Sequence, residues 1–511
     1  MTLVQETHGA TSTTALPVLR ELFDRLHAEG IRYCHWKSNE HLGASMTGAT
    51  DVDILVDRQA AQRLTRVLTD SDSFKRFVVK PGHGYPGIED YVGFDDFTGA
   101  LTHLHVHYQL TLGEKFIKGH RLPWEELYLS SRVLDEEHGI YVADPHLELT
   151  VLVARAAIKV RARDVLLETL GVPYLRGGLL RELRWLAQRV DPLRLREVAS
   201  RLVGERAAGL LPRIPAAPRP SIGQLRAFAA AADPRLDEYR LFARWDAARR
   251  MSAVEWSIVW WKVRHWFSGA ATRSNRTLPQ GGLFIAFVGA DGAGKSTLTR
   301  EIAHWLSREV AVTTTYGGSG KGSASGPRRM LQGIARVQRR VAGTSVQPVE
   351  GAARAESAPS RWRVVGRLLV VLTLARERRR RALGVRRARG RGMIVLADRL
   401  PQRQFAGLND GPQLTEWVDG RPGLRRLAAR RERAAFDLAE RTAPDLVVKL
   451  HVAIDVAKQR KPETPLAQLR TGIEVVRQLR FPPTTRVLDV DASQPYPQVL
   501  LLAKRAVWER I

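Results

Sequence analysis

The chain has 511 residues, which is enough for two or three domains that each bury a core of their own. Its 80 Lys and Arg residues outnumber 53 Asp and Glu residues, and the net charge of +27 favours polyanionic partners: nucleotides, nucleic acid or an anionic membrane surface. The one cysteine excludes an internal disulfide, and with no signal-peptide pattern and no long uncharged apolar run we expect a cytoplasmic protein without a spanning helix.

Residues 17–145 mix helix and strand patterns and predict an α+β domain. Val18 to Ala28 has the pattern of a helix, and Asp51 to Val56 and Leu101 to Leu110 have the pattern of strands. Side chains alternate along a strand, so Asp51 and Asp53 share one face. Two carboxylates on one face can hold magnesium against a triphosphate.

This Asp-x-Asp strand, preceded by Lys37-Ser38 near the place of a Gly-Ser helix start, resembles the nucleotidyltransferase superfamily. The resemblance implies a nucleotidyltransferase-like fold, Asp51 and Asp53 as metal ligands, and a third carboxylate on a neighbouring strand. The matching strand instead carries three histidines on one face: His103, His105 and His107. Hard cations such as Mg²⁺ prefer oxygen ligands to the nitrogen of histidine. Whether this domain has nucleotidyltransferase activity therefore stays open. The histidines either take zinc or manganese, or they are hydrogen-bonding groups in a cleft.

Residues 146–270 predict a helical region, and residues 271–282, which are polar and contain Gly, Ser and Pro, predict a linker. Within the helical region, Val254 to Phe267 is rich in tryptophan. Such a helix either packs at a domain junction or lies in a membrane interface.

The stretch Leu283 to Arg308 predicts a phosphate-binding strand, loop and helix. Leu283 to Val288 is a continuous apolar run, as in a buried parallel strand, and Ser296 to Arg308 is amphipathic. Between them lies the pattern G-x-x-x-x-G-K-S, whose backbone amides and helix terminus would face a polyphosphate. The motif predicts that Lys295 reaches the β- and γ-phosphates and that Ser296 binds magnesium. The expected ATP-binding residues are Gly289, Ala290, Asp291, Gly292, Ala293, Gly294, Lys295, Ser296 and Thr297.

Residues 283–511 continue with alternating strand and helix patterns and predict a parallel α/β domain, with an insertion at about 317–359 that is rich in Gly, Ser, Ala and Pro. Met393 to Leu396 is a strand that leads into Asp398 and Arg399. An acidic side chain at the carboxyl end of a parallel strand can hold magnesium, and the adjacent arginine can grip a second phosphate.

The phosphate loop, Asp398-Arg399, Ala443 to Leu446 and Val490 to Ser493 together resemble the thymidylate kinase family over most of 283–511. The resemblance implies a doubly wound parallel sheet and an ATP- and Mg²⁺-dependent phosphotransferase. It implies that Asp291 faces the acceptor and that Asp398 and Arg399 handle the metal and the acceptor phosphate. It also implies an arginine-bearing lid, for which the candidates are Arg460, Arg470, Arg477 and Arg480, with Arg460 and Arg470 favoured by position.

Three departures from the thymidylate kinase pattern leave the acceptor open. Tyr316 to Ser319 stands where the family has Arg-Glu-Pro-Gly-Gly, Leu400 replaces the aromatic residue after Asp-Arg, and Pro401 to Pro412 is distinctive. Thymidylate specificity therefore does not carry over, and the acceptor is a nucleotide or a sugar-linked metabolite that carries phosphate.

The arginine-rich stretch Arg376 to Arg391 follows an apolar segment that we expect to be a helix. Its arginines either contact anionic lipid or a polyanionic substrate, or they form a solvated face. We expect no sequence-specific nucleic-acid binding, since no recognition motif is present. The alternative function is an ATP-binding regulatory or scaffolding protein at an anionic surface, without kinase turnover.

Overall fold

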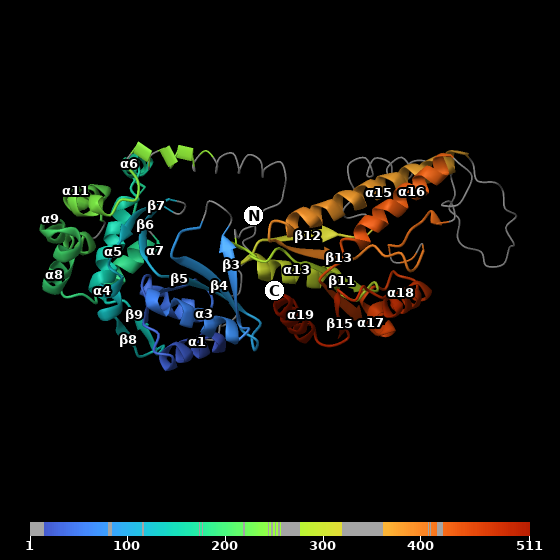
Figure 1. Cartoon of the computed structure of the whole chain (residues 1–511), viewed down its shortest axis with the longest axis horizontal. Helices are drawn as coiled ribbons and strands as arrows, with labels where there is room; N and C mark the ends of the chain where they lie inside the picture. The colour runs from blue at the N-terminus through green and yellow to red at the C-terminus, as the bar shows by residue number, and fades with distance from the viewer. Residues whose placement is uncertain are drawn as a thin grey trace. The chain divides into compact units, whose positions relative to one another are not determined.

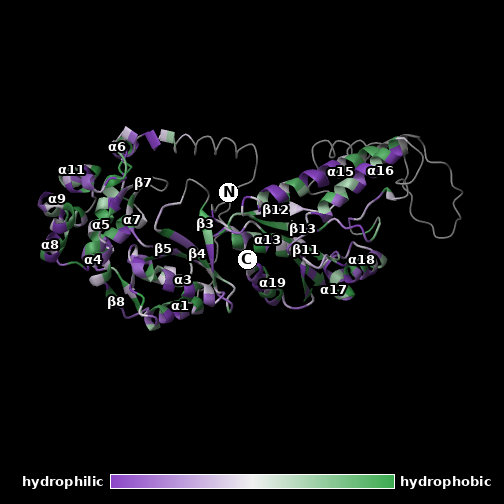
Figure 2. Ribbon diagram, in the orientation of Figure 1, coloured by the Kyte–Doolittle hydropathy of each residue, from purple (hydrophilic) through white to green (hydrophobic). Residues whose placement is uncertain are grey.

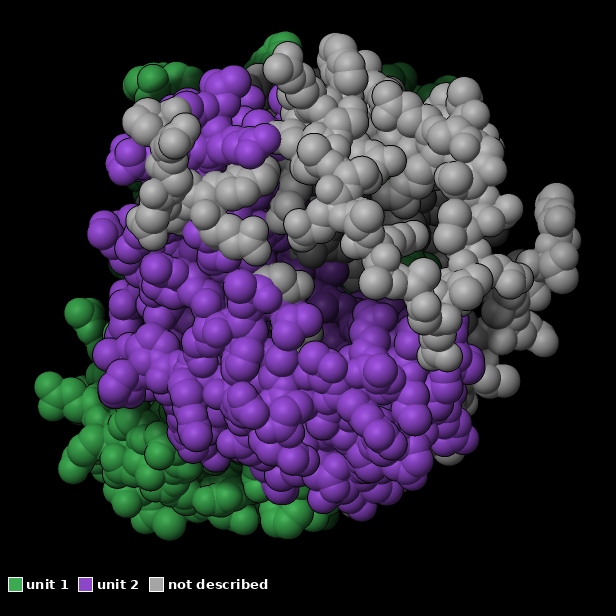
Figure 3. Space-filling view, turned by 90° about the vertical axis from the view of Figure 1, so that its right-hand side faces the viewer, with its two compact units in different colours: residues 1–271 green, residues 272–511 purple. Residues whose placement is uncertain are grey.

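The computed structural model describes residues 15–79, 84–114, 117–172, 174–175, 177–217, 220–243, 245–246, 249–250, 252–253, 256, 276–318, 361–406, 408, 410–415 and 423–511. The chain divides into two compact units, residues 1–271 and 272–511, which Figure 3 shows in different colours.

Unit 1 contains a mixed sheet whose strands pair in the order β3-β4-β5-β2-β1-β9-β8 (Figure 1). The pairs β2·β5 and β1·β9 are parallel, and the other pairs are antiparallel. The bounds are β1 (Tyr33–His35), β2 (Val52–Val56), β3 (Phe74–Val79), β4 (Ile88–Phe94), β5 (Leu101–His107), β8 (Val133–Asp135) and β9 (Ile140–Val142). A separate hairpin joins β6 (Leu110–Glu114) and β7 (Ile117–Leu122), so the single strand expected over Leu101 to Leu110 ends at His107.

The helices of unit 1 fall into two groups. The first accompanies the sheet: α1 (Pro17–Ala28), η1 (Asn39–His41), α2 (Leu42–Met46), η2 (Arg58–Ala60), α3 (Ala61–Asp70) and α4 (Glu125–Ser130). The second fills the expected helical region: α5 (Pro145–Ile158), α6 (Ala162–Thr169), α7 (Gly178–Ala187), α8 (Pro192–Val203), α9 (Glu205–Leu210), α10 (Arg213–Ala216) and α11 (Ile222–Glu238). Helix starts follow local chemistry: Asp144 and Asp191 cap α5 and α8, and each is followed by a proline.

Unit 2 is a parallel five-stranded sheet in the order β12-β13-β11-β14-β15. Its strands are β11 (Phe284–Gly289), β12 (Val312–Tyr316), β13 (Ile394–Asp398), β14 (Leu446–His451) and β15 (Arg486–Asp491), after a short β10 (Arg276–Thr277). Its helices are α13 (Lys295–Ser307), α15 (Arg361–Arg389), α16 (Leu424–Glu440), α17 (Ile454–Arg460), α18 (Leu466–Gln478) and α19 (Tyr496–Arg510). The parallel α/β fold expected for this region is confirmed.

Helices cover the sheet of unit 2 because its central strand is apolar along its length, as Figure 2 shows for β11. On one face, Phe284 and Ala286 of β11 pack with Val385 and Ala388 of α15. Since side chains alternate, Ile285 and Phe287 point to the other face, to which we assign α13 and α19, which contact each other. The phosphate loop begins at Gly289, where β11 ends, so it lies at the carboxyl end of the central strand.

Three of the predicted segments lie partly outside the described residues. Gly317 and Gly318 pack against the loop after β13, so the predicted insertion does not begin before residue 319, and residues 319–359 lie outside the described part. Residues 276–282 of the predicted linker contain β10 and the buried Leu278, while residues 271–275 lie outside the described part. The Trp-rich segment lies outside it too, except for the exposed Trp256.

None of the helices among the described residues combines the length and the hydropathy needed to cross a membrane.

Candidate functional site

The phosphate loop connects β11 to α13 with two glycines in the left-handed region. Gly292 and Gly294 have φ values of 84° and 85°. A side chain at Gly292 would also meet the backbone of Ala457 at the 2.8 Å carbonyl distance, so only glycine fits. Lys295 then begins α13, and the loop amides and helix N-terminus form the ring of donors that a phosphate requires.

The Lys295 ammonium is buried inside this loop. Only 5% of its side chain is exposed, and Nζ donates to the carbonyl oxygen of Ala290 at 2.7 Å. Burial and the nearby Arg399 lower the pKa of Lys295 to about 8, and the carboxylates of Asp291, Asp398 and Asp410 offset only part of this effect. The protein itself therefore neutralises the ammonium only in part. A bound polyphosphate would supply the missing negative charge.

Ser296 and Asp398 form a pair of oxygen ligands beside the loop. Ser296 Oγ donates to Asp398 Oδ2 at 2.5 Å, and β13 carries Asp398 next to β11, with Phe287 as its register partner. The second oxygen, Oδ1 of Asp398, is buried and has no hydrogen-bond partner among the described residues. Hydroxyl and carboxylate oxygens are the donors that Mg²⁺ prefers, so these residues fit the metal that the motif predicts.

Arg399 joins the phosphate loop to the segment after β13. Its Nη2 donates to Asp291 Oδ1 at 2.7 Å, and its Nη1 lies 3.6 Å from Asp410 Oδ2. Burial by itself would lower the pKa of Arg399, but the carboxylates of Asp410 and Asp291 outweigh it and raise the pKa. The backbone of Arg399 has φ of 72°, a conformation that costs a non-glycine residue about 1–3 kcal/mol and concentrates at functional sites.

A cleft of about 550 Å³ lies over the phosphate loop. It is lined by Asp291, Gly292, Gly294, Lys295, Ser296, Thr297, Arg399, Arg460, Lys461, Glu463 and Thr464. A second cavity, of about 240 Å³, shares Gly294, Thr297 and Arg460 with the cleft and extends to Ala492 and Tyr496. Arg460 bridges the two, since its Nη1 donates to the carbonyl oxygens of Gly292 at 3.4 Å and Ala492 at 3.0 Å.

Of the other lid candidates, Arg470 lies exposed on α18 and does not line these cavities. Arg477 is exposed and contacts Glu474 at 3.4 Å, and Arg480 is also exposed. Arg460 is therefore the lid candidate that the structure brings to the loop.

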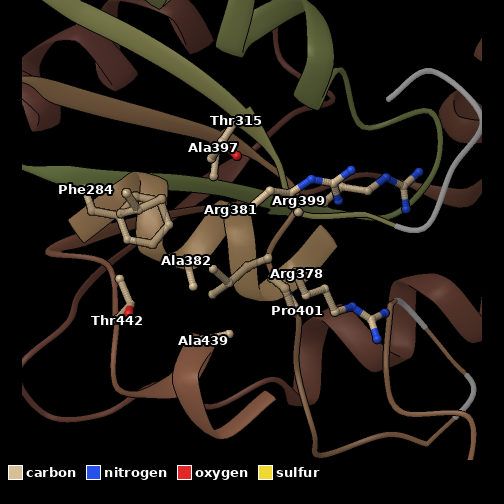
Figure 4. Close-up of a pocket in the computed structure, with 13 residues that line it drawn as sticks. Phe284, Thr315, Arg378, Arg381, Ala382, Ala397, Arg399, Pro401, Ala439 and Thr442 are labelled. Carbon is tan, nitrogen blue, oxygen red and sulfur yellow. The ribbon is translucent and has the colours of Figure 1, made fainter. Parts of the chain in front are cut away.

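A narrow pocket with arginines at one end lies between the sheet and helices α15 and α16. We call it the arginine pocket; its volume is about 40 Å³. Its lining residues are Phe284, Thr315, Gly317, Arg378, Arg381, Ala382, Val385, Ala397, Arg399, Leu400, Pro401, Ala439 and Thr442. In Figure 4 the side chains of Arg381 and Arg399 extend in the same direction, away from Phe284 and Thr442. Arg399 lines both this pocket and the cleft.

Sequence reasoning missed the roles of Arg378, Arg381 and Asp410. Within the arginine-rich stretch, the side chain of Arg378 is 2% exposed and lies 3.8 Å from Glu432, so this arginine does not belong to a solvated face. The spacing of residues along the helix could have identified the two arginines. Arg378, Arg381, Val385 and Ala388 follow one another at intervals of three or four residues, and the last two face the sheet, so all four lie on one side of α15. Asp410 carried no signal, because it lies in an irregular loop.

In unit 1 the predicted carboxylates meet the predicted histidines. Asp53 and His105 are register partners on β2 and β5, and His105 Nδ1 lies 2.9 Å from Asp53 Oδ1. His107 Nε2 lies 3.5 Å from the same oxygen, and Lys37 Nζ lies 2.9 Å from it. Asp51 precedes β2, is half exposed, and contacts His103 at 3.0 Å.

These contacts set two pKa values in the cluster. Burial would raise the pKa of Asp53, but Lys37 and the two histidines hold it well below its ordinary value. Burial and the neighbouring His105 lower the pKa of His107 to about 3, so this imidazole is neutral at pH 7. The third carboxylate of the nucleotidyltransferase pattern is absent from this position, where His105 stands.

The parallel sheet and the loop at its central strand define unit 2 as a P-loop α/β protein. Comparison with models of protein families finds no match. The uncharacterized ATP-binding protein YghR of Escherichia coli (strain K12) is 31% identical over 227 residues, which is 44% of this chain and 86% of YghR. The chain therefore belongs to the family of YghR.

Two further similarities accompany this one. The uncharacterized ATP-binding protein YghS of Escherichia coli (strain K12) is 28% identical over 226 residues, which is 44% of this chain and 91% of YghS. Among solved structures, a deoxyadenosine kinase from M. mycoides with bound dATP covers 44% of this chain and 99% of its own, with 16% identity and a TM-score of 0.22.

Proposed function

We propose that unit 2 is an ATP- and Mg²⁺-dependent phosphotransferase of the nucleoside-monophosphate kinase type, resembling thymidylate kinases. The observation that carries this proposal is Arg399, which lines both the cleft and the arginine pocket and is paired with Asp291 of the phosphate loop at 2.7 Å. An arginine so placed can hold an acceptor anion while the loop holds the donor. The relatives YghR and YghS, which are described as ATP-binding, support ATP as the donor.

The donor site follows from the loop. Loop amides and Lys295 bind the β- and γ-phosphates, and the second cavity beside Ala492 and Tyr496 receives the nucleoside. Arg460, which already bridges the loop and Ala492, turns toward the phosphates as the lid cation. Ser296 and Asp398 hold Mg²⁺, which when bound supplies positive charge to the phosphate oxygens.

The reaction is a displacement at the γ-phosphorus. An acceptor oxygen forms the new bond to phosphorus, the bond to the β–γ bridging oxygen breaks, and ADP leaves with that electron pair. Where the acceptor is a hydroxyl, Asp291 orients it and takes its proton. Where the acceptor is a phosphate, no proton needs to move, and Arg399 aligns it instead.

The arginine pocket supports an acceptor that carries phosphate, either a nucleotide or a sugar-linked metabolite. Arg381 and Arg399 at one end of it can meet an anionic group, although each also contacts a carboxylate. A volume of about 40 Å³ does not hold a nucleoside. Thymidylate itself is not proposed, because Gly317 and Gly318 pack directly on Arg399 where the thymidylate kinase signature would stand.

The proposal has three further parts. Residues 17–145 form a nucleotidyltransferase-like domain, supported by the pairing of β2 with β5 that brings Asp53 to His105. We propose no transfer activity for it, since β5 carries His105 where that pattern has its third carboxylate. The protein acts in the cytoplasm, where ATP is supplied. The exposed arginines of α15, such as Arg379 and Arg387, offer a peripheral contact to an anionic membrane.

The test is phosphoryl transfer from γ-labelled ATP to three kinds of acceptor: nucleoside monophosphates, sugar phosphates and a protein-free extract of cell metabolites. We expect a labelled product with the wild type, none with Lys295→Ala or Asp398→Asn, and wild-type turnover with the control Lys75→Ala, whose lysine lies on β3 of unit 1. ATP binding without transfer to any acceptor would reject the kinase in favour of an ATP-binding regulatory or scaffolding protein.

A further inference from the structure

Three ligand-type atoms converge on one face of the sheet in unit 1. His105 on β5 is the register partner of Asp53 on β2, and His107 lies two residues further along on the same face. Asp53 Oδ1 is 2.9 Å from His105 Nδ1 and 3.5 Å from His107 Nε2, and the two ring nitrogens are 3.2 Å apart. Two adjacent strands therefore bring two imidazole nitrogens and one carboxylate oxygen into a small triangle.

The size of this triangle matches one face of a tetrahedral metal site. With metal–ligand bonds of about 2.0–2.1 Å and tetrahedral angles, ligand atoms lie about 3.3 Å apart. The three sides observed here, 2.9, 3.2 and 3.5 Å, lie around that value. An ion placed just off the plane of the triangle would reach all three atoms without rearrangement of the strands.

Hydrogen bonds alone satisfy this cluster poorly. Asp53 Oδ1 has three nitrogens around it: His105 Nδ1 at 2.9 Å, Lys37 Nζ at 2.9 Å and His107 Nε2 at 3.5 Å. His107 Nδ1 is buried and has no hydrogen-bond partner among the described residues, so polar contacts hold this ring through Nε2 alone. A cation at the centre of the triangle can take a lone pair from Asp53 Oδ1, His105 Nδ1 and His107 Nε2 at once.

Neighbouring side chains hold the donors in place. His107 is 2% exposed and packs edge-on against Trp36, with ring centroids 5.1 Å apart. Lys37, 21% exposed and lying over the same Trp36 ring at 5.0 Å, is the group that competes for the carboxylate. Removal of its charge should therefore strengthen binding of a metal.

We propose that Asp53, His105 and His107 form a binding site for a divalent transition-metal ion, with Zn²⁺ as the best match. Nitrogen-rich donors favour zinc over Mg²⁺, which prefers oxygen ligands. This site is distinct from the magnesium pair expected at Asp51 and Asp53, because Asp51 contacts His103 instead. Three protein ligands leave a fourth position for water or for a ligand of the unit.

The test uses the full chain without an affinity tag, stripped with a chelator and then titrated with Zn²⁺ against a chromophoric chelator. We expect one tightly bound zinc per chain, and cobalt substitution giving the visible spectrum of a tetrahedral site. His105→Ala and His107→Gln should weaken binding by 10- to 100-fold or more. His138→Ala, which removes a histidine paired with Asp135 elsewhere in unit 1, is the matched control and should bind as the wild type does.

Lys37→Met decides the matter independently of any loss of folding. It should tighten zinc binding by about tenfold, or about 1.4 kcal/mol, because it removes the ammonium that competes with the metal for Asp53. A wild-type chain that binds no zinc beyond that of the triple variant Asp53→Asn/His105→Ala/His107→Gln, or a Lys37→Met chain that binds zinc no better than the wild type, overturns the proposal.

Discussion

Lys295 is a lysine whose basicity is set by burial, and this gives the phosphate loop a dependence on pH. Its pKa of about 8 lies below the ordinary value of 10.5, so the ligand-free loop is protonated below pH 8 and neutral well above it. Burial of the charge therefore opposes folding below pH 8, and this penalty fades as the pH rises toward 10.5.

A bound polyphosphate should reverse the shift, because four negative oxygens favour the ammonium. We expect ATP binding at pH 8.5 to 9, where ATP itself is fully ionised, to take up a substantial fraction of a proton, and at pH 7 to take up none through this group. Titration calorimetry in buffers of different ionisation enthalpy measures the uptake. Lys295→Arg, which stays charged, should remove it; equal uptake by that variant would assign the proton to another group.

At the scale of elements, the loops after β12 and β13 are packed so closely that a methyl group does not fit between them. A Cβ at Gly317 would overlap the carbonyl oxygen of Arg399, whereas nothing lies within 4 Å of a Cβ at Gly384 on α15. We expect Gly317→Ala to displace Arg399 and to reduce transfer activity at least tenfold. Gly384→Ala should leave activity unchanged and stabilise the helix by about 0.5–1 kcal/mol. Activity equal in the two variants would show that the Arg399 loop is not needed.

Helices α15 and α16 are joined by a buried ion pair. Arg378 and Glu432 are each 2% exposed, and the Arg378 guanidinium also stacks on Phe436 at 4.3 Å. Arg378→Met leaves Glu432 buried without its counter-charge, so we expect a loss of about 3 kcal/mol in unfolding free energy. Arg379→Met, on the exposed side of the same helix, should change it by less than 0.5 kcal/mol. Chemical denaturation measures both, and similar midpoints for the two variants would contradict this account.

The element scale also shows what a sequence can predict. The loop, Ser296 and Asp398 were predictable because a contiguous motif and the carboxyl ends of parallel strands fix their positions. Arg378 looked like one member of a solvated charge run, because composition hides which face of a helix an arginine takes. The sequence places Gly317 at the start of an insertion. A glycine required for close packing cannot be distinguished, in a single sequence, from a glycine in a loose segment.

At the scale of the whole molecule, each unit has its own core. One core of unit 1 groups Leu19, Phe23 and Ile54 with their neighbours, and one core of unit 2 groups Phe284, Ala286 and Val395. We therefore expect two thermal transitions in calorimetry of the full chain. An unreactive ATP analogue with Mg²⁺ at 100 times its Kd should stabilise only the transition of unit 2, by about 2.7 kcal/mol. Lys295→Ala should abolish that shift, and a single transition that moves as a whole would contradict independent cores.

The contact between Arg399 and Asp291 bears on whether water can react with bound ATP. Asp291 Oδ1 accepts a hydrogen bond from the Arg399 guanidinium at 2.7 Å, so this oxygen is occupied when a water molecule enters the cleft. On the proposed function, we expect an arriving acceptor anion to compete with Asp291 for the Arg399 guanidinium. On the proposed function, we therefore expect this ion pair to limit hydrolysis of bound ATP while no acceptor is present.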